Sequence, residues 1–191
     1  VEVTVVNPRD EFVERVRLHQ ELAGTGTAVG GLREMLADPI TLRVGTAEKI
    51  GDGTLPLDDG TALPYDYLIY APGGAPTSPA GTVPIAGIDG ARTAGQALAA
   101  LPEGAAVTVV GGGLTGVETA AEIAAARPEL SIRLVSESGL TPSVHPAARA
   151  RIADELDRFG ITVEHRRFTA GEDDGLSLWA IASQVSDLAA R

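Results

Sequence analysis

The chain has 191 residues, of which 44% are hydrophobic, with a net charge of −11 and no cysteine. This length is sufficient for one large domain or two small ones with a buried core. The acidic charge argues against nucleic acid or an anionic membrane as a partner, and the lack of cysteine excludes disulfides, thiolate metal sites and a redox dithiol within this chain.

The first forty residues predict one strand and one helix, with a stretch of mixed pattern between them. Alternating valines over residues 1–6 indicate a strand that ends at Asn7. Charged and apolar side chains are mixed over residues 12–20, a pattern that we interpret as a solvated loop or a short helix. A helix is expected over residues 30–37, where apolar residues share one face before Pro39.

Residues 40–71 read as a series of short strands separated by turns that contain glycine and aspartate. The strand candidates are residues 40–44, 47–50, 54–57 and 67–71. The next stretch, 72–84, is rich in glycine and proline and is typical of a linker. Thr93 and Gln96 have the form of a capping box, which predicts a helix that begins there and ends at Pro102.

The most informative stretch runs from residue 105 to residue 137. A β-branched apolar run over 105–110 predicts a strand buried on both faces, and a glycine turn over 111–116 follows it directly. Apolar residues at helical spacing continue to Pro128, and residues 131–135 predict the next parallel strand. A strand, a G-x-G-x-x-G turn, a helix and the acidic Glu137 about 20 residues on together predict a dinucleotide site.

Each glycine of this motif has its own predicted role. Gly111 makes the tight turn, Gly113 lets the backbone approach a pyrophosphate, and Gly116 lets the helix pack on the strand. The free amides and the positive dipole end of the helix then face the phosphates.

The last third of the chain predicts one more helix and one more strand. Ser143 is expected to cap a helix that ends at Gly160, and residues 161–164 read as a strand. Residues 176–191 show a frayed helical pattern. The three histidines are far apart and no serine lies in a nucleophile elbow, so neither a metal site nor hydrolytic chemistry is predicted.

These motifs resemble those of the flavin-dependent pyridine-nucleotide oxidoreductases, particularly the branch of type II NADH dehydrogenase and apoptosis-inducing factor. Residues 110–120 are similar to that family's NAD(P)H fingerprint, and residues 3–20 to the second strand of its FAD domain. Residues 67–74 resemble the motif that closes over the flavin, and residues 44–47 the strand whose backbone meets the adenine.

The resemblance implies an α/β fold of two doubly wound Rossmann-like lobes. We expect a partial FAD-binding domain over residues 1–90, an NAD(P)-binding domain over 91–178 and a return segment over 179–191. The implied function is transfer of hydride from NAD(P)H to FAD and on to a small-molecule electron acceptor such as a quinone. The alternatives are a nucleotide-binding module without redox turnover, and a domain whose sheets are completed by another chain.

The resemblance also implies cofactor contacts, with no catalytic side chain and no metal ligand. The residues that match NAD(P) contacts are Gly111, Gly112, Gly113, Leu114, Thr115, Gly116, Glu118, Ser136 and Glu137. Those that match FAD contacts are Asn7, Arg9, Thr46, Ala47, Ala71, Pro72 and Gly73. The carboxylate that matches Glu118 lies near the nicotinamide in the family. Ser136 with a nearby arginine would suit the 2′-phosphate of NADPH and Glu137 the free diol of NADH, so both coenzymes stay open.

The chain also departs from the family pattern. Nothing before residue 1 supplies the FAD pyrophosphate loop, and the late Gly-Asp flavin motif would lie beyond Arg191. Asn7 stands where the family usually has the acid that holds the FAD ribose. A further turn and strand are expected between Leu178 and Trp179. The sequence therefore looks like an incomplete version of a longer enzyme.

The sequence also bears on location. It contains no apolar run as long as a membrane span and no signal peptide, so we expect a cytoplasmic protein without an integral membrane segment. A homo-oligomer is compatible with the sequence, which specifies neither the oligomeric state nor the acceptor.

Overall fold

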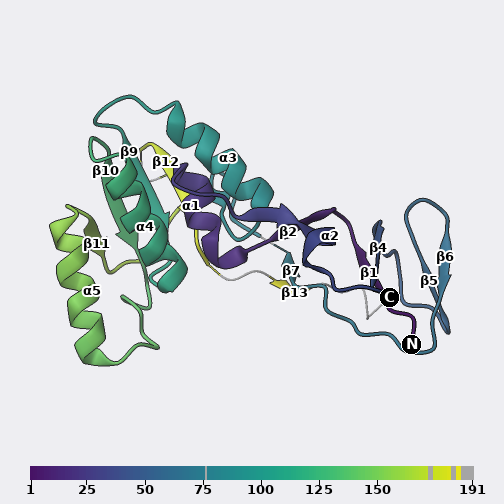
Figure 1. Ribbon diagram of the computed structural model, residues 1–191. Coiled ribbons are helices and arrows are strands. Elements are labelled where there is room, and N and C mark those ends of the chain that lie inside the picture. Colours follow the sequence, from purple (N-terminus) through teal and green to yellow (C-terminus); the bar gives the residue numbers. More distant parts are fainter. Residues whose placement is uncertain (76, 172–173, 182–183, 186–191) are drawn as a thin grey trace. The chain divides into compact units, whose positions relative to one another are not determined.

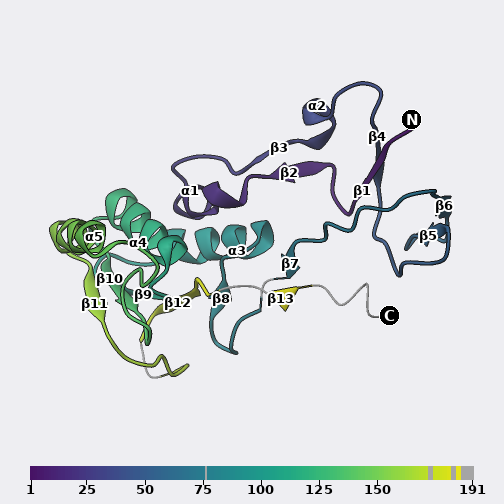
Figure 2. The ribbon, with the colours of Figure 1, turned by 90° about the horizontal axis from the view of Figure 1, so that it is seen from below.

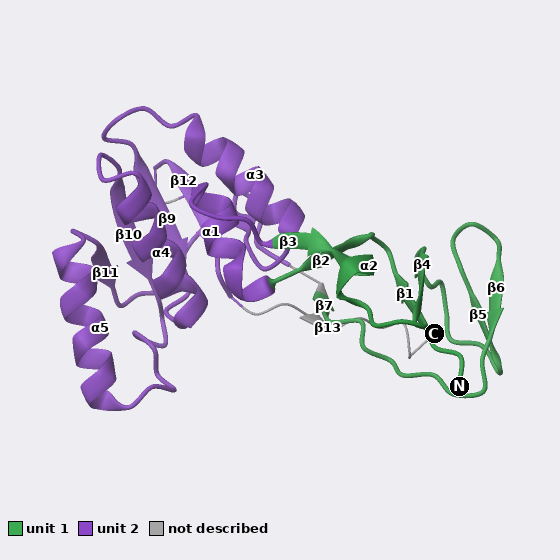
Figure 3. Cartoon of the chain, viewed as in Figure 1, with its two compact units in different colours: residues 1–14, 29–75, 184–191 green, residues 15–28, 76–183 purple. Residues whose placement is uncertain are grey.

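The computed structural model describes residues 1–75, 77–171, 174–181 and 184–185. The chain divides into two compact units, shown in green and purple in Figure 3. Unit 1 comprises residues 1–14, 29–75 and 184–191, and unit 2 comprises residues 15–28 and 76–183. The boundary therefore differs from the expected division at residue 90, because unit 2 starts at residue 76 and also holds an early segment of the chain.

Unit 2 is built on a parallel sheet of five strands in the order β11–β10–β9–β12–β8. The strands are β8 (Val83–Pro84), β9 (Ala106–Val110), β10 (Ser131–Val135), β11 (Thr162–Glu164) and β12 (Leu176–Trp179). From β9 the chain proceeds to β10 and β11 on one side, whereas β12 and β8 lie on its other side. The strand order thus reverses beside β9, which is where open α/β sheets bind ligands.

Helices line one side of this sheet, as Figure 2 shows. α3 (Ile88–Ala99), α4 (Leu114–Ala126) and α5 (Pro146–Arg158) each connect two parallel strands (Figure 1). α4 packs on β9 and β10, and α3 packs on β8 and β12. α1 (Leu18–Ala23) packs on α3 and α4 and lies on the side of α3 that faces away from the sheet in Figure 2.

The core of unit 2 accounts for these elements. Val107, Val109, Leu134 and Leu178 are fully buried in the sheet, and Ile123 is fully buried on α4. Burying each such side chain is worth about 1.5–3 kcal/mol relative to exposure. The β-branched run that predicts a strand buried on both faces does form the central strand β9.

The early segment of unit 2 is helical, where the mixed pattern over residues 12–20 predicts a solvated loop or a short helix. It contains a 3-10 helix, η1 (Arg15–Arg17), followed by α1. Leu18 and Leu22 are only 5% and 2% exposed. Gly95 of α3 permits this close packing, because a Cβ there would lie 2.9 Å from the carbonyl oxygen of Leu22. The charged side chains therefore flank a buried leucine pair, and of the two interpretations the short helix is confirmed over residues 15–20.

Unit 1 consists of short paired strands. β1 (Thr4–Asn7) lies parallel to β4 (Thr41–Val44). The antiparallel pairs are β2 (Glu11–Val13) with β3 (Val29–Gly31), β5 (Thr54–Pro56) with β6 (Ala62–Pro64), and β7 (Gly74–Ala75) with β13 (Gln184–Val185). The strands predicted over 1–6, 40–44 and 54–57 are confirmed, with β6 as an unpredicted partner.

The strand predicted over residues 67–71 is wrong. These residues form no strand, and Tyr67 and Ile69 are 94% and 93% exposed. A strand requires a neighbour that pairs its amides and carbonyls, and none of the described strands pairs with this segment.

Two further predictions in unit 1 hold only in part. The helix expected over residues 30–37 shortens to α2 (Leu32–Met35), because residues 29–31 pair with β2. The strand expected over 47–50 reduces to a single bridge between Ala47 and Leu57.

Both predicted helix caps in unit 2 are wrong. α3 begins at Ile88 after Gly87, so Thr93 lies inside the helix. α5 is capped by His145, whose Nδ1 accepts a hydrogen bond from the amide of Ala147 at 3.3 Å, rather than by Ser143.

The end of unit 2 also differs from its prediction. Residues 176–179 form β12 instead of a frayed helix, because they complete the sheet beside β9. No turn or strand separates Leu178 from Trp179, and the ring of Trp179 packs edge-on against Phe168 with 6.3 Å between centroids. Residues 186–191 of the expected helix lie outside the described residues.

Candidate functional site

The glycine turn lies at the carboxyl end of β9, beside the point where the strand order reverses. β9 ends at Val110 and α4 begins at Leu114, so Gly111–Gly113 connect them. Gly111 has a φ of +125°, a conformation that favours glycine. Its amide donates to the carbonyl of Val135 at 2.9 Å. The turn is therefore fixed to the neighbouring strand β10.

Gly116 allows α4 to approach this turn closely. A Cβ at Gly116 would lie 1.8 Å from the carbonyl oxygen of Gly111 and 3.4 Å from Cδ1 of Leu134. Any side chain at this position would push the helix away from the sheet. This close contact is what a G-x-G-x-x-G turn requires of its last glycine.

The N-terminus of α4 is open to solvent. Gly113, Leu114 and Thr115 are exposed, and no atom lies within 4 Å of the position that a Cβ on Gly113 would take. The first amides of an α-helix have no acceptor within the helix, and no side chain caps α4 at Gly113. These amides and the positive end of the helix dipole suit an anion such as a diphosphate.

A cavity of about 550 Å³ adjoins the carboxyl end of β10. Its wall includes Glu137 and Gly139 from the loop after β10, Arg149 from α5, and His165. A Cβ on Gly112 would lie only 2.2 Å from the carbonyl oxygen of Gly139. The cavity and the glycine turn are therefore neighbours, so one ligand could occupy both.

The polar side chains around the cavity differ in whether their polar atoms are already hydrogen-bonded within the protein. The hydroxyl of Ser136 is buried and donates to the carbonyl of Gly139 at 3.0 Å. Nη2 of Arg149 donates to the carbonyls of Pro142 and Val144, each at 3.1 Å. The side chain of Glu137 is exposed on the cavity wall. Glu137 is thus the predicted residue whose polar atoms are best placed to meet a ligand there.

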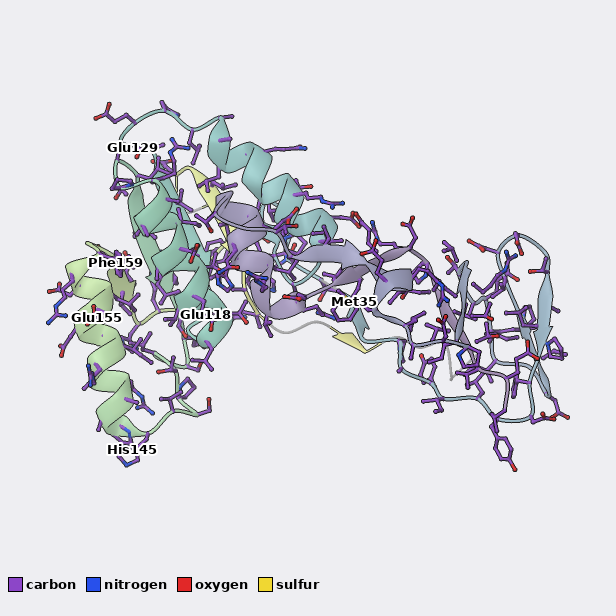
Figure 4. All side chains as sticks on the ribbon, viewed as in Figure 1. Met35, Glu118, Glu129, His145, Glu155 and Phe159 are labelled. Carbon is purple, nitrogen blue, oxygen red and sulfur yellow. The ribbon has the colours of Figure 1, made fainter. Side chains whose placement is uncertain are left out.

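Glu118, the remaining predicted contact in unit 2, lies on the second turn of α4 (Figure 4). Its side chain is exposed. The glycine turn and Glu118 lie between β9 and β10, and the other predicted contacts of unit 2 directly follow β10, so all of them belong to one continuous stretch of the chain.

In unit 1, the predicted contacts fall into two groups. Asn7 and Thr46 lie at or just beyond the carboxyl ends of the parallel strands β1 and β4, where Nδ2 of Asn7 donates to the carbonyl of Arg9 at 2.7 Å. Ala47 follows at its bridge to Leu57. The second group, Ala71, Pro72 and Gly73, lies in a segment without regular structure.

The backbone of Thr46 is already engaged. Its amide donates to Oδ1 of Asp58 and its carbonyl accepts from the amide of Asp58, both at 3.0 Å. The structure thus satisfies internally the backbone groups of Thr46, one of the residues that the resemblance places at the adenine.

Sequence reasoning missed the loop residues that surround the glycine turn. Gly139, Thr141, Arg149 and His165 have no motif of their own, and their proximity depends on the packing of the loop after β10 and of α5. A glycine two positions after Glu137 is the only local signal that this loop approaches other backbone closely.

The described residues contain neither a metal-binding cluster nor a membrane-spanning helix. Three or more His, Asp or Glu side chains do not gather anywhere in this part of the chain in a way that could hold a metal ion. The helices in the same part of the chain lack the combination of length and apolar character needed to cross a membrane.

A parallel α/β sheet with a glycine turn at its switch point defines a Rossmann-like dinucleotide-binding fold. A family model described as pyridine nucleotide-disulphide oxidoreductase matches residues 1–188. The chain belongs to this family, whose members use FAD and NAD(P)H, and the resemblance drawn from the sequence is confirmed.

Solved structures support the fold. NDH2 from Plasmodium falciparum is 20% identical with a TM-score of 0.76, and the match covers 96% of this chain and 50% of that one. The sulfide:quinone oxidoreductase from Aquifex aeolicus is 14% identical with a TM-score of 0.73, covering 98% and 54%. NADH:rubredoxin oxidoreductase from Clostridium acetobutylicum is 17% identical with a TM-score of 0.73, covering 94% and 51%.

The chain therefore spans about half the length of these structures. At such low identities the likeness establishes the fold alone. A search of curated proteins found no match.

Proposed function

We propose that the protein is an FAD-dependent NAD(P)H oxidoreductase in which unit 2 binds the nicotinamide dinucleotide. The observation that carries this proposal is the open N-terminus of α4 behind a glycine turn, at the switch point of a parallel sheet. Membership of the pyridine nucleotide-disulphide oxidoreductases supports it. When bound, FAD supplies the hydride acceptance and onward electron transfer that protein side chains cannot provide.

The residues of unit 2 would bind and orient the dinucleotide. Gly111–Gly116, with Leu114 and Thr115 at the helix start, would hold the diphosphate through backbone amides. Glu118 would lie toward the nicotinamide end, as its match to the family motif suggests. No side chain need act as an acid or base in the hydride step, since the cofactors carry that chemistry.

The cavity side chains favour NADH over NADPH in this proposal. The hydroxyl of Ser136 is turned to Gly139, and Nη2 of Arg149 is bound to two carbonyls. The exposed carboxylate of Glu137 suits a free 2′,3′-diol and repels a 2′-phosphate.

Unit 1 would contribute to the flavin site. We assign Asn7 and Arg9 to the ribose end of FAD, Thr46 and Ala47 to the adenine, and Ala71–Gly73 to the flavin side. Asn7 cannot accept a ribose diol as a carboxylate does, and its amide already donates to Arg9. We therefore expect the 191-residue chain to bind FAD more weakly than it binds NAD(P)H.

The proposed acceptor is a quinone-like small molecule. The chain contains no cysteine, so no redox dithiol within it can relay electrons from the flavin. Among proteins of similar fold, one is named for a quinone and another for rubredoxin. We favour the quinone because it needs no protein docking surface.

A second candidate is a nucleotide-binding module without redox turnover. The engaged backbone of Thr46 favours this candidate, because both of its polar groups are bonded to Asp58 rather than open to an adenine.

Visible absorption of the purified protein, followed by NADH oxidation with a soluble quinone, separates the two candidates. Bound flavin that NADH reduces under anaerobic conditions supports the oxidoreductase. Protein that binds NADH yet stays colourless after incubation with FAD supports the module.

A further inference from the structure

The loop after β10 controls the orientation of one peptide in the glycine turn. The amide of Thr141 donates to the carbonyl oxygen of Gly112 at 2.6 Å. In a planar trans peptide, the carbonyl of Gly112 and the amide of Gly113 point in opposite directions. Because the carbonyl of Gly112 points to Thr141, the amide of Gly113 points away from that loop. Gly113 is also the position where the turn is open to solvent.

The approach of this loop depends on the absence of a side chain at Gly112. A Cβ there would lie 2.2 Å from the carbonyl oxygen of Gly139 and 2.6 Å from Oγ of Ser136. The hydroxyl of Ser136 in turn holds the carbonyl of Gly139 at 3.0 Å. Ser136, Gly139 and Thr141 therefore enclose Gly112 from one side, and we call these three residues the Gly112 clamp.

Thr141 adopts an unfavourable conformation to take part in this clamp. Its φ is +38°, which is a rare outlier for a β-branched residue. The side chain is 1% exposed, and its hydroxyl has no hydrogen-bond partner among the described residues. Strained residues persist where the surrounding structure holds them in place, and they gather at functional sites. A glycine would relieve the strain at position 141, yet the chain carries threonine there.

We propose that Thr141 is a positioning residue for the diphosphate of the dinucleotide, an inference that rests on the proposed function. Its amide fixes the peptide between Gly112 and Gly113 so that the amide of Gly113 faces the ligand before binding. This preorganisation avoids the cost of turning the peptide when the diphosphate arrives. Thr141 itself touches no ligand in this proposal and acts through Gly112.

The test compares ligands with and without a diphosphate. An α-hydroxy analogue of threonine at position 141 replaces the amide by an ester and removes the donor to Gly112. The dissociation constants of adenosine, ADP and NADH are then measured by calorimetry. We expect ADP and NADH to bind about fivefold or more weakly, while the affinity for adenosine stays within about twofold of wild type. The matched control is the corresponding ester at Ile161, whose amide donates to Leu156 at 2.9 Å away from the turn, and this variant should keep all three affinities.

Two substitutions keep the proposal testable if the ester variant fails to fold. Thr141→Gly relieves the backbone strain and frees the loop, so it should retain or raise Tm while lowering the affinity for ADP relative to adenosine. Thr141→Val removes only the hydroxyl and should preserve that ratio. An unchanged ratio in a folded Thr141→Gly protein, or in a folded ester variant, would overturn the positioning role while leaving the proposed function intact. Failure of the wild-type protein to bind ADP or NADH would instead overturn the proposed function, and the positioning role with it.

Discussion

Replacing Gly113 by alanine should weaken dinucleotide binding without unfolding the protein. Gly113 has φ −73° and ψ 178°, which alanine adopts without strain, and a Cβ there would meet no atom within 4 Å. Alanine is a poorer N-cap than glycine by about 0.5–1 kcal/mol, but restricting the unfolded chain returns about 0.4–1 kcal/mol. These effects nearly cancel, so Tm should shift by no more than about 3 °C.

The effect on binding should be much larger. The new Cβ would occupy the space through which the backbone approaches a diphosphate. Losing one hydrogen bond to a charged group costs about 1.5–3 kcal/mol. This loss corresponds to a roughly 10- to 150-fold rise in the Kd for NADH.

Calorimetric titration with NADH and thermal unfolding of the same samples measure both quantities. The matched control is Gly104→Ala in the same unit, where a Cβ also meets no atom within 4 Å but φ is +78°. This control should lose stability through strain and keep its affinity for NADH. A folded Gly113→Ala protein whose Kd for NADH lies within about twofold of wild type would refute the reasoning.

The other predictions concern packing, coenzyme choice, pH and flavin. Gly116→Ala should lower the free energy of unfolding by about 3 kcal/mol or more, because its Cβ would overlap the carbonyl oxygen of Gly111, and denaturant titration measures this loss. Glu137→Ala should shift the ratio of the Kd values for NADH and NADPH toward NADPH by about tenfold, and an unchanged ratio would contradict the assignment of Glu137 to the ribose. The hydrogen bond from Arg127 lowers the pKa of Glu129, so this carboxylate stabilises the fold above the ordinary pKa of glutamate and loses that contribution as the pH falls through the lowered value. Glu129→Gln should therefore lose less stability than wild type on acidification in thermal scans. The chain should bind FAD more weakly than NADH, because Nδ2 of Asn7 is engaged with Arg9, and a Kd for FAD below that for NADH would contradict this expectation.

The dinucleotide unit could be predicted from the sequence because its signals are local. The run from 105 to 135 specifies a buried strand, a glycine turn, a helix and a second strand, all of which form at the predicted places. The roles of Gly111 and Gly116 follow from backbone geometry that any such turn requires. These features depend on residues close together in the chain.

Features that depend on distant contacts could not be predicted in this way. Leu18 and Leu22 are hidden among charged residues, and their burial depends on α3 and α4 more than sixty residues later in the chain. The predicted cap of α3 is wrong for a related reason. Thr93 has capping-box spacing, but α3 already starts at Ile88. The pattern over 67–71 has the composition of a strand, yet a strand also needs a partner.

The Gly112 clamp could not be predicted from the sequence. Nothing in the sequence signals that Thr141 takes a positive φ or that its amide reaches Gly112. The contact results from the path of the loop after β10, which no local periodicity describes.

Hydrogen exchange measured by mass spectrometry, with and without NADH, tests most directly whether unit 2 is the dinucleotide site. The account predicts slower exchange on NADH binding in peptides that cover Gly111–Val117 and Glu137–Thr141, with unchanged exchange in β5 and β6. Protection confined to unit 1, or no protection at either segment at saturating NADH, would contradict it.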